Sequence, residues 1–322
     1  MKSLQQRKER VAMLSVASNF LLVILKLIVG ALIGSVAIIS EAIHSGMDLL
    51  AAIIALFSVK KSNIPADDDH PFGHGKVESI SGLVEAVLIF IAAFWIIFEA
   101  LKKFSSAQVL ESPGWGVVVM LFSAGMNYFV SSKLFHVGKE ADSIALQADA
   151  WHLRTDVYTS AGVMVSLAVI WFSHMVFIHP NIHWLDPIAA MFIAVFILKA
   201  AYNLTSKALA DLMDVKLPAD EEEWIRNIIS GQRPDVHGFH RLRTRKAGNF
   251  RFIEFHVKVN PQMSVLSSHG ITRELKKIIM NKLPHSTVTI HIEPCEGECT
   301  EECVAGCLLA KEKRPIRIKY SR

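Results

Sequence analysis

The chain has 322 residues, of which 52% are hydrophobic and only 20% are charged, a composition that argues against soluble globular modules. The formal net charge of +4 does not indicate a nucleic-acid partner, because basic membrane proteins concentrate Lys and Arg in their cytoplasmic loops. All four cysteines lie after residue 294, which excludes a disulfide framework for the body of the protein.

Six apolar segments have about the 20 residues that a helix needs to cross a bilayer. The first follows a charged N-terminus and has no small-residue cleavage site, so we expect a retained span rather than a signal peptide. An even number of spans places both termini on one side, and the basic loops on that side predict that it is cytoplasmic. The predicted spans are residues 11–33, 38–58, 79–101, 115–136, 144–173 and 184–206.

The pattern changes after Asp214, where a soluble segment begins. The run LPADEEEWIRNII predicts an amphipathic helix opened by a proline and acidic residues. The next run, HRLRTRKAGNFRFIEFHVKVN, alternates charged and apolar residues around an Ala-Gly-Asn turn and predicts a β-hairpin. A segment of helical period and a further alternating strand follow. This order predicts a small α+β domain with an open sheet.

We therefore expect an α-helical membrane protein with six transmembrane helices, followed by a C-terminal cytoplasmic domain. Residues 1–214 would form the transmembrane domain. Residues 215–294 would form the α+β domain, of order αββαβ and metallochaperone-like. Residues 295–322 would form a tail that is first Cys-rich and then basic.

Two of the predicted spans each carry a histidine and an aspartate four residues apart. His44 and Asp48 lie on one helical face of the second span, and His152 and Asp156 repeat this spacing in the fifth. Ionisable side chains inside a bilayer are costly and usually functional. Two imidazoles and two carboxylates form a donor set that suits tetrahedral Zn²⁺, and Co²⁺ and Cd²⁺ fit it as well. The alternative is that each pair is a local hydrogen bond that stabilises helix packing.

Such a site would also bind protons. A histidine coordinates a metal ion only after it has lost a proton, so metal and H⁺ compete for the site. This competition is a physical basis for metal/proton exchange. The sequence contains no GxxxxGK[ST] motif that would supply energy from ATP, and no HExxH motif of a metallohydrolase.

At this point the chain resembles the cation diffusion facilitator family, and its layout is similar to bacterial zinc/proton antiporters of the YiiP type. The resemblance covers residues 10–294 and implies a homodimer that exports a divalent metal ion through a transport site formed by the two His-Asp pairs. It rests on the motifs HSGMD, PADDDHPFGHGKVES, LQADAWHLRTD, HRLRTR, FHVKV, SSHG and TIHIEP.

One residue of the transport site departs from the YiiP type, which has an aspartate where this chain has His44. The histidine resembles that of zinc, cobalt and cadmium exporters. We therefore expect Zn²⁺ as the transported ion, with Cd²⁺, Co²⁺ and Fe²⁺ as alternatives. The resemblance also implies a bacterial inner membrane, with both termini cytoplasmic.

The resemblance implies a second metal site in the loop after the second span. It corresponds to Asp67, His70 and His74, and one carboxylate with two imidazoles within eight residues is independently a chelating set. Asp68 or Asp69 could replace the first ligand. The alternative is a solvated polar loop.

A third, regulatory two-ion site is implied in the cytoplasmic domain. YiiP-type proteins have an aspartate at the last of its positions, and the longer glutamate places the bridging geometry in question. Taken alone, the histidines in the predicted strands would be interpreted as partly buried core residues. The corresponding residues are His240, His256, His269, His291 and Glu293.

The cysteine-rich tail lies outside the resemblance. Its four cysteines recur every four residues, so a helix would present them as one stripe of soft thiolate ligands. Positions spread over about 18 Å of helix cannot all reach one ion, so the segment either bends at its glycines or binds ions in pairs. A disordered tail with reduced cysteines is an equal alternative. The residues are Cys295, Cys299, Cys303 and Cys307, with glycines at Gly297 and Gly306.

A rival function is a transport-incompetent relative that serves as a metal sensor or scaffold. The loss of a transport ligand would favour that function, but all four positions hold metal-competent residues. We therefore expect a secondary active transporter and not an enzyme. Zn²⁺ would be both cargo and regulatory ion, without an organic cofactor. The expected partners are the second subunit, the lipid bilayer, divalent metal ions and protons.

Overall fold

A computed structural model of the chain describes residues 2–33, 36–105, 115–176, 185–232, 234–299, 301–310, 314 and 317–318. The chain divides into two compact units, residues 1–210 and 211–322.

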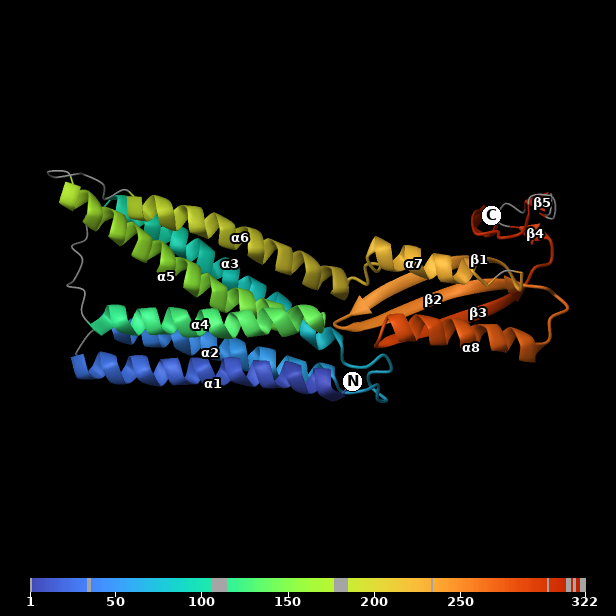
Figure 1. The fold of residues 1–322 in the computed structure, drawn as a ribbon, viewed down its shortest axis with the longest axis horizontal. Coiled ribbons are helices and arrows are strands. Elements are labelled where there is room, and N and C mark those ends of the chain that lie inside the picture. Colours follow the sequence, from blue (N-terminus) through green and yellow to red (C-terminus); the bar gives the residue numbers. More distant parts are fainter. Residues whose placement is uncertain are drawn as a thin grey trace. The chain divides into compact units, whose positions relative to one another are not determined.

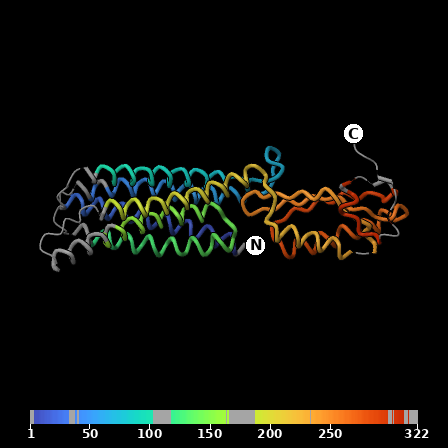
Figure 2. Tube along the Cα trace, turned by 90° about the horizontal axis from the view of Figure 1, so that it is seen from above, coloured from blue at the N-terminus to red at the C-terminus, as the bar shows by residue number. Residues whose placement is uncertain are grey.

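In the described residues, the first unit consists of six long helices. Figure 1 shows α3, α5 and α6 inclined to α1, α2 and α4, and Figure 2 shows the helices side by side along the length of the bundle. Five of the described helices are long and apolar enough to cross a membrane. The other, α5, carries Asp149, Arg154 and Asp156 in its N-terminal half. The predicted helical membrane fold is therefore confirmed. The helices are α1 (Lys2–Ile33), α2 (Val36–Ser62), α3 (Lys76–Ser105), α4 (Trp115–Glu140), α5 (Ile144–Val176) and α6 (Leu185–Leu212).

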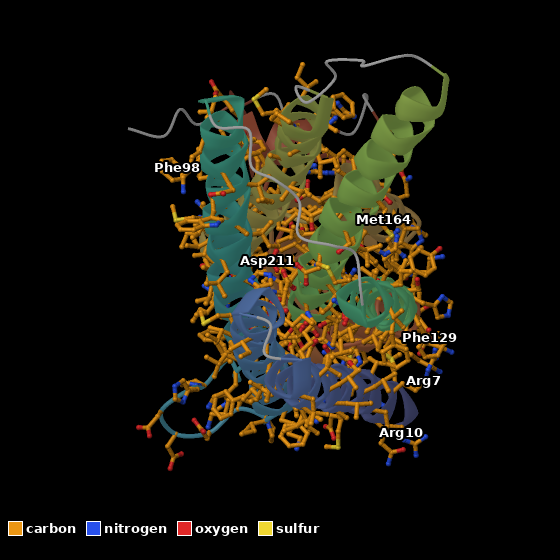
Figure 3. All side chains as sticks on the ribbon, turned by 90° about the vertical axis from the view of Figure 1, so that its left-hand side faces the viewer. Arg7, Arg10, Phe98, Phe129, Met164 and Asp211 are labelled. Atoms are coloured by element: carbon orange, nitrogen blue, oxygen red, sulfur yellow. The ribbon has the colours of Figure 1, made fainter. Side chains whose placement is uncertain are left out.

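Small and branched apolar residues hold these helices together. One buried cluster joins α1, α2, α4 and α5 around Leu134, Leu146 and Leu153, and a second joins α3, α5 and α6. Large aromatic residues lie instead on the outside, where Phe98 of α3 and Phe129 of α4 point away from the bundle (Figure 3). This distribution suits a bundle whose outer surface faces lipid tails.

A buried polar network joins the helices at one end of the bundle. Glu78, in the first turn of α3, is fully buried and accepts hydrogen bonds from Lys8 of α1, Ser62 of α2 and Ser143, which precedes α5. The carboxylate is thus both paired with a cation and hydrogen-bonded, as a buried charge requires. We call the end of the bundle that holds these four residues the base.

The second unit has the predicted αββαβ order: α7 (Ala219–Ser230), β1 (Val236–Ala247), β2 (Phe250–Val259), α8 (Val265–Lys282) and β3 (Ser286–Pro294). The strands form a mixed sheet of order β1-β2-β3, in which β1 and β2 are antiparallel and β2 and β3 are parallel. Gly248 has a φ of 61° in the predicted hairpin turn, a conformation that favours glycine. Ile225 of α7 and Leu275 of α8 pack with the sheet residues Phe255 and Val257 in the core.

The cysteine-rich segment bends and does not form the continuous helix that would align its cysteines. It forms the strand β4 (Glu298–Cys299) and the short helix α9 (Glu301–Ala305). Cys307 then forms an isolated β-bridge with Gly238 of β1. The strand β5 (Arg317–Ile318) pairs with β4. The N–H of Phe239 donates to the carbonyl of Gly306 at 3.1 Å. A Cβ at position 306 would lie 1.7 Å from the Phe239 carbonyl oxygen, so this close approach requires glycine.

Candidate metal centres

The two His-Asp pairs meet between α2 and α5, and their shortest contacts run from one helix to the other. Nε2 of His152 lies 3.0 Å from Oδ1 of Asp48, and Nε2 of His44 lies 3.6 Å from Oδ1 of Asp156. Within α2, the distance from Nε2 of His44 to Oδ1 of Asp48 is 3.9 Å, too long for a hydrogen bond. For this pair, the alternative of a local hydrogen bond within one helix does not describe the arrangement.

Three of these four residues are gathered more tightly than the fourth. His44, Asp48 and Asp156 each offer a ligand atom within 4.8 Å of the others, whereas His152 joins them through its contact with Asp48. Asp48 and His152 are buried, but the side chain of His44 is 52% exposed. The site is therefore open on the side of His44 rather than sealed within the protein.

A cavity of about 30 Å³ adjoins His44, Asp48 and Asp156, with room for an ion or a water molecule. Its other walls include Lys26 of α1 and Met120 of α4, which lie in the halves of these helices that are away from the base. On the other side of the quartet, the apolar cluster around Leu134, Leu146 and Leu153 separates it from the base network. The cavity therefore lies on the side of the site that is remote from the base.

Three polar residues at this cavity were not predicted from the sequence. Nζ of Lys26 lies 2.8 Å from the hydroxyl of Ser45 and 3.2 Å from the carboxylate of Glu41, and Asn127 donates to Asp156 at 3.5 Å. The sequence did contain a signal for these residues, because a charged or amide side chain within an apolar span indicates a functional position. Glu41 also precedes His44 by three residues and so shares its helical face.

Two further buried carboxylates, also not predicted, lie on α3 and α5. Glu85 and Asp149 are both fully buried, and Glu85 contacts the hydroxyl of Ser81 at 3.4 Å. Neither oxygen of Asp149 has a hydrogen-bond partner among the described side chains and backbone. Asp149 precedes His152 by one helical turn, so acidic groups continue along α5 from the quartet toward the base.

The loop between α2 and α3 gathers the predicted residues Asp67, His70 and His74, whose ligand atoms lie within 4.8 Å of one another. Oδ1 of Asp67 lies 3.1 Å from Nδ1 of His70, and its other oxygen lies 3.5 Å from Nε2 of His74. The backbone N–H of His70 also donates to Asp67 and keeps the pKa of this carboxyl below its ordinary value. Gly73 has a φ of 78° and makes the turn between the histidines. Asp68, an alternative ligand, is exposed and outside this group, as is Asp69.

In the second unit, three histidines form a row across the sheet. His240 of β1 pairs in register with His256 of β2, which pairs with His291 of β3. Glu293 lies beside this row, 2.7 Å from Nδ1 of His256, 3.5 Å from Nε2 of His240 and 3.7 Å from Nε2 of His291. The longer arm of glutamate therefore reaches all three imidazoles.

Lys258 of β2 also binds this carboxylate and was not predicted. Its ammonium lies 2.7 Å from Oε2 of Glu293. Burial opposes ionisation of Glu293, but hydrogen bonds from Lys258 and His256 outweigh that effect and lower its pKa to about 2. Burial lowers the pKa of His240, which keeps the imidazole neutral and able to coordinate a metal ion.

One predicted histidine and the predicted cysteines do not join a metal-binding group in the described part of the chain. His269 is exposed on α8 and lies outside the group formed by His240, His256 and Glu293, because its position on a helix separates it from the row across the sheet. Among the described residues, no cysteine belongs to a group of three or more candidate metal ligands, although Cys303 is buried.

Comparison with known proteins matches both units. Residues 12–213 match the family model described as "Cation efflux transmembrane domain", and residues 217–295 match "Cation efflux protein, cytoplasmic domain". An uncharacterized transporter of Synechocystis sp. is 34% identical over 88% of this chain and 90% of its own length. The cation-efflux pump FieF of Escherichia fergusonii is 30% identical over 89% of this chain and 92% of its own. The solved metal-bound C-terminal domain of the CzcD transporter from Thermotoga maritima is 31% identical, covering 25% of this chain and 96% of that one, with a TM-score of 0.23.

Proposed function

The chain belongs to the cation efflux, or cation diffusion facilitator, family, and on that premise we propose that it exports Zn²⁺ from the cytoplasm in exchange for protons. It is an integral membrane cation-efflux transporter and not an enzyme. The observation that carries the proposal is the juxtaposition of two imidazoles and two carboxylates between α2 and α5.

The dimensions of this site support zinc. Ligand atoms around a tetrahedral ion with bonds of about 2.0–2.1 Å lie roughly 3.4 Å apart, and the His-Asp contacts of 3.0, 3.6 and 3.9 Å bracket that value. Imidazole nitrogen favours zinc over manganese, which prefers oxygen ligands. His44 therefore supports selectivity for Zn²⁺ and Cd²⁺ over Mn²⁺.

The same contacts support proton exchange. A hydrogen atom must lie between Nε2 of His152 and Oδ1 of Asp48 at 3.0 Å, because two bare acceptors would repel. When the imidazole is protonated at both nitrogens, a metal ion that binds through these atoms displaces that hydrogen, which leaves the site as H⁺. Protons returning to the site release the metal in turn, which couples the two fluxes.

The position of the cavity supports one state of the proposed transport cycle. If the base is the cytoplasmic end, as the basic residues near it indicate, the quartet has its cavity on the exterior side and its seal on the cytoplasmic side. These features would suit an outward-facing state of an alternating-access cycle, which we propose for a homodimer in the bacterial inner membrane. The loop cluster and the histidine row would bind regulatory Zn²⁺ on the cytoplasmic side.

The test is zinc transport by the purified protein in liposomes with an imposed pH gradient. We expect Zn²⁺ flux to follow the gradient and Asp156→Asn to reduce it to the background of empty liposomes. His136→Ala is the matched control, because His136 is an exposed imidazole on α4 outside all the clusters. Undiminished flux in Asp156→Asn would overturn the transport site. Zinc binding without flux in the wild type would favour the rival sensor or scaffold function.

A further inference from the structure

A second cavity of the first unit lies between α4, α5 and α6, apart from the metal centres. Its volume is about 490 Å³, and each of the three helices contributes one cation to its wall: Lys139, Arg154 and Lys207. None of the described residues that line it is acidic. It is therefore a strongly basic pocket within a bundle that is otherwise apolar on its outer surface.

This pocket lies on the opposite face of α5 from the transport site. Trp151, Arg154 and Tyr158 recur at spacings of three and four residues and form one stripe along the helix, whereas His152 and Asp156 form another. Arg154 is two residues from each of these ligands, which turns it about 200° around the helix from both. Figure 1 shows α5 running between α4 and α6, the helices that form the other two walls.

Neutral groups contact two of the three cations and leave their charge uncompensated. Nε and Nη2 of Arg154 donate to the hydroxyls of Ser131 and Ser132 at 2.9 and 2.8 Å, and its guanidinium lies 4.6 Å from the ring centre of Tyr128. Lys139 lies over the ring of Phe135 at 5.9 Å. Across the described ranges, none of the three cations forms an ion pair with a carboxylate. Converging cations near hydrocarbon are costly unless an anion joins them.

The depth of the pocket suits a lipid phosphate. Lys139 lies in the last turn of α4, and Lys207 lies five residues before the end of α6, so both are near the end of the bundle that holds the base network. Phospholipid phosphates lie at that level of a membrane, where Trp and Tyr side chains are also enriched. Leu204 and Trp151 supply an apolar wall along which an acyl chain can lie.

We propose that this pocket binds the phosphate of an anionic phospholipid such as phosphatidylglycerol. Arg154 would bind two phosphate oxygens through its remaining N–H groups, and Lys139 and Lys207 would add charge from the flanking helices. Basic pockets between transmembrane helices hold anionic head groups in this way. The proposal goes beyond the transport function and does not depend on the identity of the transported metal.

The test measures lipid retention by the full-length protein in neutral detergent, with native mass spectrometry as the readout. Phosphatidylglycerol should be retained in preference to phosphatidylcholine, and excess inorganic phosphate should not displace it. Arg154→Gln and Lys207→Gln should each weaken phosphatidylglycerol binding by about five-fold. Lys133→Gln is the matched control, because Lys133 lies over Phe129 on the same helix as Lys139 but does not line the pocket.

Equal retention of the two lipids by the wild type would overturn the proposal, as would unchanged phosphatidylglycerol binding in Lys207→Gln. Displacement by inorganic phosphate would show that the pocket binds free phosphate and would overturn the lipid assignment. Arg154 has structural hydrogen bonds, so its variant could lose the fold. Lys207 is exposed, so Lys207→Gln should fold and can test the proposal if Arg154→Gln does not.

Discussion

Removing the cation from the buried pair at the base should destabilise the protein far more than removing an exposed cation beside it. In Lys8→Ala, the carboxylate of Glu78 stays fully buried and keeps only the hydroxyls of Ser62 and Ser143 as hydrogen-bond donors. Breaking a buried ion pair by removing one partner costs about 3–5 kcal/mol. For a unit of this size, that cost corresponds to a fall in melting temperature of roughly 6–20 °C.

The adjacent residue supplies the matched control. Arg7 forms a salt bridge with Glu140, but the two side chains are 43% and 42% exposed. An exposed pair contributes at most about 1 kcal/mol, so Arg7→Ala should lower the melting temperature by only a few degrees. The measurement is thermal unfolding in mild detergent, followed by circular dichroism at one protein concentration for all variants.

A double variant separates the loss of the pair from the loss of packing. Lys8→Met with Glu78→Leu removes both charges, and an apolar replacement of a buried pair is often neutral or stabilising. We expect it to regain most of the stability that Lys8→Ala loses. Equal melting temperatures for Lys8→Ala and Arg7→Ala would refute the reasoning, because they would show that Glu78 is not confined to a dry site.

The other predictions concern metal selectivity and the histidine row of the second unit. His44→Asp should raise Mn²⁺ transport relative to Zn²⁺ in a competition assay in liposomes, since it replaces nitrogen with oxygen; an unchanged ratio would exclude His44 as the selective ligand. Glu293 has a pKa of about 2 against an ordinary 4.5, so the stability it contributes is complete above about pH 4.5 and lost as the pH falls toward 2. Glu293→Gln should flatten this part of an acid titration of ellipticity. An unchanged acid limb would show that the contacts of Glu293 with His256 and Lys258 do not contribute to stability. Lys258→Met should tighten zinc binding in calorimetry by freeing the carboxylate that Lys258 occupies, whereas weaker binding would show that Lys258 supports the site.

Local patterns in the sequence were sufficient to predict the helices and strands of the fold, but they were not sufficient to predict every metal ligand. The hairpin turn at Gly248 and the order of the second unit follow from alternation and helical period, which depend on neighbouring residues. The glycines of the tail indicated that it could bend, but its course depends on the close approach of Gly306 to Phe239, a tertiary contact that local spacing does not specify. His269 matched a motif, yet its helix holds it away from the histidine row.

The residues missed at the transport site have a similar physical origin. Spacing within one helix identifies side chains that share a face, but not which residues of other helices turn toward them. Asn127 of α4 and Lys26 of α1 come to the cavity only through packing. Their polarity within apolar spans was a usable signal, because such residues seldom face lipid.

The buried pair at the base is also a suitable element for a gate. Opening an apolar seal exposes apolar surface to water at a cost of about 25 cal/mol per Å². No favourable hydration of charged groups offsets this cost. Opening a buried ion pair lets water hydrate both ions, which offsets the lost attraction between Lys8 and Glu78. Opening the base itself would then cost less free energy than opening an apolar seal, although loading metal would also require the apolar cluster around Leu134 to part. Lys8→Met with Glu78→Leu should therefore fold well but transport Zn²⁺ more slowly than the wild type, because its base stays closed. A wild-type rate in liposomes would show that the pair contributes to stability alone.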